Sequence, residues 1–78
     1  MSPYPFSKLP ALSGKEAVKA FQKLGWTVDR YHGDHAIMVK DGEEAILTVP
    51  QHPELKKATL KNILLAGGIR LDEFKSVL

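Results

Sequence analysis

The feature that most constrains the fold of this sequence is the change of hydrophobic period along the chain. Apolar residues recur at helical spacing in residues 14–24 and again in residues 56–66. Between these segments apolar and polar residues alternate, in short runs separated by turns that contain glycine. This order predicts one α+β domain of α-β-β-β-α layout, in which a three-stranded antiparallel sheet packs against two helices.

The first helix is predicted from signals at both of its ends. Ser13 and Glu16 match the S-x-x-E capping box, in which each side chain accepts a hydrogen bond from the other residue's backbone N–H. Gly25 supplies a C-terminal stop. The apolar face between these signals consists of Ala17, Val18, Phe21 and Leu24. The domain is therefore expected over residues 13–78, with residues 1–12 as an extended lead-in from which Tyr4, Phe6 and Leu9 could dock.

Three strands are expected at residues 26–31, 35–40 and 44–49. Residues 32–34 form the first turn, and Asp41-Gly42 predicts a tight hairpin between the second and third strands. Strict alternation in the first strand puts Tyr31 on the face opposite Val28. Pro50 ends the third strand.

The C-terminal part of the chain is expected to be helical. A helix from about residue 56 to residue 66 turns Leu60, Ile63 and Leu64 inward and ends at Gly67-Gly68. A short helix over about residues 71–78 offers further side chains to a core that also holds Phe21 and Trp26. These are Leu71, Phe74, Val77 and Leu78.

Composition restricts the class of protein. The chain has 78 residues and no cysteine, which excludes disulfides, thiolate zinc sites and a cysteine nucleophile. Its first residues lack the basic and apolar regions of a secretory leader, and no apolar run approaches the roughly 18 residues of a membrane span. We expect a cytoplasmic protein with no membrane contact. The net charge is only +2, with positive charge gathered in the two helical segments and negative charge between them.

Residues 14–78 resemble the HicA family of bacterial toxins, the ribonuclease half of a toxin–antitoxin pair. The resemblance rests on several motifs in a fixed order and spacing. These are residues 24–26 (LGW), 33–35 (GDH), 48–52 (TVPQH) and 54–69 (ELKKATLKNILLAGGI).

The resemblance implies a fold like the double-stranded-RNA-binding domain and cleavage of messenger RNA without a metal or other cofactor. It also implies a single catalytic histidine at the start of the second strand, and a HicB-type antitoxin as partner. By position that histidine is His35. The chain departs from the family pattern at Asp34, where Ser or Asn is frequent, and at Ala58, where Gly is common.

The chemistry of RNA supports a role for a histidine. The 2′-OH of RNA is a nucleophile next to the phosphate, so the protein has to move protons and stabilise the added phosphate charge. Imidazole suits proton transfer because its ordinary pKa lies near neutrality. Our hypothesis is that His35 is the general base or acid; otherwise it is an ordinary residue at the start of a strand.

Three neighbours are candidate supporting residues, namely Gly33, Asp34 and His52. A two-histidine ribonuclease would use His52, but the spacing alone does not bring the two rings together. Anchoring of the loop is the preferred interpretation of His52. The three histidines show no zinc-binding spacing, so no metal site is expected.

Two groups of lysines are candidates for contact with RNA phosphates. Lys56, Lys57 and Lys61 cluster at the start of the second helix and are the preferred RNA-binding residues. Lys15, Lys19 and Lys23 form a stripe on the first helix, which is equally well explained as a solvated face.

Two alternatives remain open from the sequence. Tyr31, Ala36, Met38 and Ile46 would form an apolar surface for an antitoxin, unless residues 1–12 cover it. The whole chain could also be a non-catalytic RNA- or protein-binding module of the same fold, because Asp34 places a negative charge where a phosphate would approach.

Overall fold

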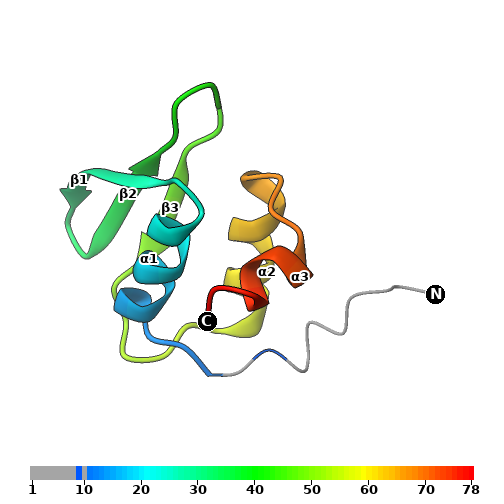
Figure 1. Ribbon diagram of the computed structural model, residues 1–78. Coiled ribbons are helices and arrows are strands. Elements are labelled where there is room, and N and C mark those ends of the chain that lie inside the picture. The colour runs from blue at the N-terminus through cyan, green and yellow to red at the C-terminus, as the bar shows by residue number, and fades with distance from the viewer. Residues whose placement is uncertain (1–8, 10) are drawn as a thin grey trace.

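The computed structural model describes residues 9 and 11–78 of the chain (Figure 1). The expected docking residues Tyr4 and Phe6 lie outside the described residues, whereas Leu9 is buried in the core. The elements in chain order are α1 (Gly14–Lys23), β1 (Thr27–His32), β2 (His35–Val39), β3 (Leu47–Pro50), α2 (Lys57–Ala66) and α3 (Leu71–Lys75). The three strands form one antiparallel sheet in the order β1-β2-β3, which confirms the predicted α-β-β-β-α layout.

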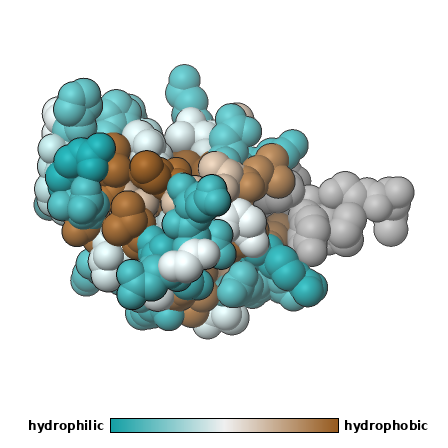
Figure 2. All heavy atoms as spheres, turned by 90° about the horizontal axis from the view of Figure 1, so that it is seen from above, coloured by the Kyte–Doolittle hydropathy of each residue, from teal (hydrophilic) through white to brown (hydrophobic). Residues whose placement is uncertain are grey.

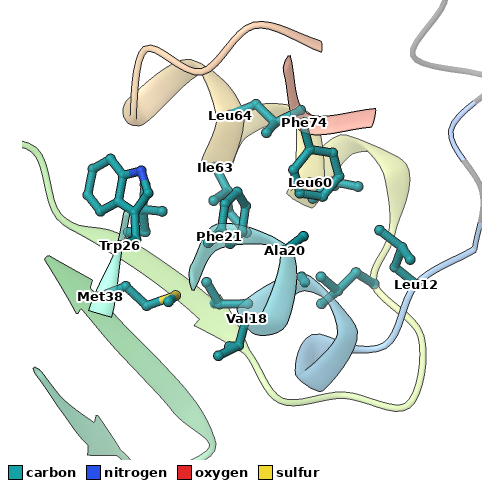
Figure 3. Close-up of a cluster of buried hydrophobic side chains, with 14 of the residues drawn as sticks. Leu12, Val18, Ala20, Phe21, Trp26, Met38, Leu60, Ile63, Leu64 and Phe74 are labelled. Carbon is teal, nitrogen blue, oxygen red and sulfur yellow. The ribbon is translucent and has the colours of Figure 1, made fainter. Parts of the chain in front are cut away.

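The helices enclose a core on one face of the sheet (Figure 3). The rings of Phe21 in α1 and Phe74 in α3 pack with their centroids 5.1 Å apart. Trp26 and the inward residues of α2 are buried, as the sequence predicted. Leu78 is exposed, so its predicted place in the core is wrong; α3 ends at Lys75 and does not carry the last residue inward. No helix within residues 9 and 11–78 is long and apolar enough to cross a membrane.

A β-bulge interrupts the alternation of β1. Val28 pairs with Met38 and Arg30 pairs with Ile37, so Asp29 is an extra residue opposite no partner. Beyond the bulge Tyr31 pairs with Ala36, and paired residues of antiparallel strands point to the same face. Tyr31 therefore lies on the same face as Val28, and the predicted strict alternation is wrong at this point.

The connection between β2 and β3 is longer than the predicted tight hairpin. The turn at Asp41-Gly42 does form, since the Glu43 amide donates to the Lys40 carbonyl at 3.0 Å. The ladder resumes only with Leu47 opposite Met38. This register buries a leucine opposite Met38, where a two-residue hairpin would place an alanine, so the larger apolar side chain decides the register.

The predicted apolar surface for an antitoxin does not exist as described, because the helices cover two of its four residues. Ala36 and Met38 are fully buried under α1 and α2. Tyr31 and Ile46 remain 62% and 51% exposed. Figure 2 shows one face of the molecule, on which hydrophobic side chains form small groups between hydrophilic ones.

The start of α1 lies directly against the end of β3. The amide of Gly14 donates a hydrogen bond to the carbonyl of His52 at 2.9 Å. A Cβ atom on Gly14 would collide with the carbonyl oxygen of Pro50 and would lie 2.6 Å from the Cα of Gln51. Only glycine permits this approach, which brings the loop after β3 beside the helix.

We predict that Gly14→Ala destabilises the protein although alanine is the better helix former. Overpacking against a rigid backbone typically costs about 1–3 kcal/mol in unfolding free energy. Denaturant unfolding measures the change. Lys15→Ala, at the exposed next position, is the matched control and should stay within about 0.5 kcal/mol of the parent. A Gly14→Ala variant as stable as the parent would contradict the packing described here.

The predicted capping box is present at the start of α1. The Ser13 amide donates to Glu16 Oε1 at 2.9 Å, and the Glu16 amide donates to Ser13 Oγ at 3.1 Å. The hydrogen bond from the Ser13 backbone, helped by the Ser13 side chain and the charge of Lys19, holds the pKa of Glu16 below its ordinary value of 4.5. Because the folded-state pKa is the lower one, ionised Glu16 stabilises the fold above pH 4.5. That contribution is lost as the pH falls through the lowered pKa.

We therefore predict a pH-dependent difference between the parent and Glu16→Gln. Glutamine keeps the capping hydrogen bond but has no charge to titrate. The parent should be the more stable protein above pH 4.5, and its advantage should shrink in acid. Urea midpoints measured over a series of pH values check this. An advantage that stayed constant or grew as the pH fell would rule out the assigned role of the carboxylate.

Candidate functional site

The tight turn between β1 and β2 positions the first side chain of the candidate site. His32 pairs with His35, so Gly33 and Asp34 are the two central residues of the hairpin loop. Gly33 has a φ of 62°, whereas Asp34 has no positive φ. A positive φ at the first central position alone is the pattern of a type II′ turn, which favours glycine there. Asp34 is thereby held at the tip of the hairpin, directly before His35.

The end of β3 brings a second histidine to the same place. His35 lies opposite Pro50 in the ladder between β2 and β3. The amide of Gln51 then donates to the backbone carbonyl of Asp34 at 2.6 Å. With its own carbonyl bound by the amide of Gly14, His52 is fixed beside the hairpin tip.

The carboxylate of Asp34 lies between the two imidazole rings. Its Oδ1 is 3.3 Å from Nδ1 of His35, and its Oδ2 is 3.1 Å from Nε2 of His52. The contact to His52 is a hydrogen bond, and because a carboxylate only accepts, Nε2 of His52 is the donor. The contact to His35 is an ion pair. In the neutral ring of His52 the other nitrogen, Nδ1, is then left as a proton acceptor. The side chains of His35 and His52 are 42% and 55% exposed, so a large substrate can reach them.

The structure thus brings together Asp34, His35 and His52, three residues proposed from the sequence. Gly33 lies in the turn that positions Asp34 and His35. The structure also shows that the rings of His35 and His52 share one carboxylate, which sequence spacing could not establish. Within residues 9 and 11–78 no three His, Cys, Asp or Glu side chains are arranged to hold a metal ion.

An open cavity of about 550 Å³ adjoins this site, between α1 and the β1–β2 hairpin. Its walls contain Lys15 and Lys19, one turn apart on α1, and Tyr31 and Asp34 from the hairpin. The remaining lining residues are Val18, Gln22, Gly33 and Gln51. The cavity joins cationic, apolar and aromatic groups beside the carboxylate that binds both histidines.

The lysines favoured from the sequence occupy another element. Lys56 is the N-cap residue of α2, and Lys57 and Lys61 lie in its first turns, all three exposed. They do not line the cavity at Asp34, whereas Lys15 and Lys19 do. The four-residue spacing of Lys15, Lys19 and Lys23 was visible in the sequence. No local signal, however, placed these lysines near Asp34. Tyr31 was assigned from the sequence to an apolar surface for an antitoxin, and its place in the cavity wall was not predicted because it depends on the bulge in β1.

Comparison with known proteins gives one finding. The family model described as "HicA toxin of bacterial toxin-antitoxin" matches residues 14–69, more than half of the chain. The matched segment runs from the first residue of α1 to the loop after α2, and it contains the hairpin tip, His35 and His52. No curated protein matches the sequence.

We predict a single neutral tautomer for His52. The proton of its neutral ring should reside on Nε2, the nitrogen that makes the hydrogen bond to Asp34. Long-range ¹H–¹⁵N spectra distinguish the tautomers, with the exposed His32 as internal reference. Asp34→Ala should return the His52 ring to the tautomer mixture of His32. An unchanged His52 ring spectrum in Asp34→Ala would show that the carboxylate does not orient this ring.

Proposed function

This chain belongs to the HicA toxin family of bacterial toxin–antitoxin systems, and we propose that it acts as an endonuclease that cleaves messenger RNA. The observation that carries the proposal is the Asp34 carboxylate, which holds the rings of His35 and His52 at an open surface. Lysines line the cavity beside it, so a polyanion is the substrate that the surroundings favour.

His35 is the proposed proton-transfer residue. Its Nδ1 lies 3.3 Å from Asp34 Oδ1, and its imidazole is proposed to take the proton from a 2′-OH of the RNA. The 2′-oxygen then bonds to the adjacent phosphorus, and the bond from phosphorus to the 5′-oxygen breaks. The 5′-oxygen leaves with a proton from water, giving one product with a 2′,3′-cyclic phosphate and one with a 5′-OH. RNA supplies the nucleophile itself, so this chemistry needs no metal and no cofactor.

Asp34 and His52 are proposed to support His35. The negative charge of Asp34, 3.3 Å from Nδ1 of His35, stabilises the imidazolium that forms on proton uptake. His52 occupies the second carboxylate oxygen and thereby limits the rotation of Asp34. Asp34 is therefore proposed as a positioning group that contacts both imidazoles.

The remaining parts of the proposal follow from the substrate and the family. Lys56, Lys57 and Lys61 at the start of α2 are proposed to bind RNA phosphates away from the cleaved bond, since lysines and a helix N-terminus both favour anions.

The family name implies an antitoxin, and we propose one of the HicB type. A messenger-RNA substrate places the protein in the cytoplasm.

We predict that His35→Ala lowers the rate of RNA cleavage by at least about 100-fold, the usual minimum for loss of a general acid–base residue. His52→Ala should cause a smaller loss, because it only loosens Asp34. His32→Ala, in the same hairpin, is the matched control and should leave the rate unchanged. Single-turnover cleavage of a labelled transcript with analysis of the product ends measures all three, in the presence of EDTA.

Growth arrest on expression of the chain alone gives a parallel readout. Arrest by the parent and the His32→Ala variant, with loss of arrest in His35→Ala, is the expected pattern. Full toxicity or full cleavage in His35→Ala would remove His35 from the mechanism. A parent protein that binds RNA without cutting it would instead be a binding module.

A further inference from the structure

The cavity beside Asp34 has the features of a nucleotide site. Its volume of about 550 Å³ lies within the range of about 300–1,000 Å³ that is usual for small-molecule sites. It shares Asp34 with the two histidines, so whatever occupies it is a direct neighbour of the proposed cleavage site. We infer that it binds one unpaired nucleotide of the RNA, next to the phosphate that is cleaved. This inference rests on the proposed function, because it takes RNA as the substrate.

Tyr31 is the group that would hold the base. The bulge at Asp29 turns Tyr31 onto the helix-covered face, opposite the small side chain of Ala36. Ala36 is fully buried, while Tyr31 is 62% exposed, so the aromatic side chain is not packed into the core. An exposed aromatic ring at the wall of an open cavity is a stacking surface for a base.

The helix wall of the cavity suits the rest of a nucleotide. Lys15 and Lys19 lie on the same face of α1, one turn apart, and Val18 lies between them in the sequence. The two ammonium groups are suited to phosphate oxygens, and Val18 offers apolar contact to the sugar. Gln22 adds an amide that can donate to and accept from a base edge.

The occupant has to be unpaired. A base within an A-form duplex is stacked on both of its faces, so it presents no free face to Tyr31. The cavity therefore predicts cleavage within single-stranded segments or loops. Duplex RNA of the same sequence should bind less well than the single strand.

Binding to an RNA analogue that cannot be cut tests this inference separately from catalysis. A short labelled 2′-O-methyl oligonucleotide of mixed sequence lacks the 2′-OH nucleophile, so fluorescence anisotropy reports binding alone. Tyr31→Ala and Tyr31→Leu should weaken binding by about five- to 100-fold, the range for loss of one stacked base. Tyr31→Phe keeps the ring and should stay within about twofold of the parent.

Charge variants provide the matched control. Lys19→Gln should weaken binding and lower the slope of log affinity against log salt by about 0.7, the value for one lost contact to a single strand. Lys75→Gln removes the same charge from the exposed last turn of α3 and should change neither quantity. Circular dichroism confirms that each variant is folded.

Three results would overturn the inference. The first is binding by Tyr31→Ala and Tyr31→Leu at parent affinity, and the second is an equal effect of Lys19→Gln and Lys75→Gln. The third is tighter binding of duplex RNA than of the single strand with the same sequence. Tyr31-dependent binding by a parent protein that fails to cut unmodified RNA would uphold the nucleotide site and reject the nuclease.

Discussion

The close approach of Gly14 to the end of β3 is the contact on which the geometry of the site depends. No side chain separates the start of α1 from the backbone of Pro50 and Gln51, and the Gly14 amide binds the carbonyl of His52. The same helix presents Phe21 and its neighbours to the sheet. Packing of the core and placement of His52 are therefore coupled through one junction between two backbones.

The Asp34 carboxylate contributes geometry more than stability. Ion pairs and hydrogen bonds at exposed positions typically add only about 0–1 kcal/mol, and all three side chains here are substantially exposed. The contacts of Asp34 with the two histidines matter for the orientation of the rings. One tight turn and one strand pairing place both rings beside the same carboxylate. The departure from Ser or Asn at position 34 thus gives this chain a carboxylate that contacts two histidines at once.

Features that depend on near neighbours in the chain were predictable. The capping box of Ser13 and Glu16 acts within four residues, and the apolar face of α2 follows from its own period. The prediction of a tight hairpin at Asp41-Gly42 was wrong, although the local turn does form. The strand register depends instead on which side chain is buried opposite Met38. The preference of Asp41-Gly42 for a tight turn contributes less free energy than the burial of one more large apolar side chain.

The sequence by itself determined the order of elements, the family and the place of His35 at the start of β2, since each follows from motifs of contiguous residues. Only the tertiary structure decided that His52 meets Asp34, 18 positions earlier in the chain, and that Tyr31 faces the cavity. The physical reason is the same in both cases. Strand register and the bulge depend on how the whole sheet packs against the helices. No local pattern in the sequence specifies the total packing free energy that decides them.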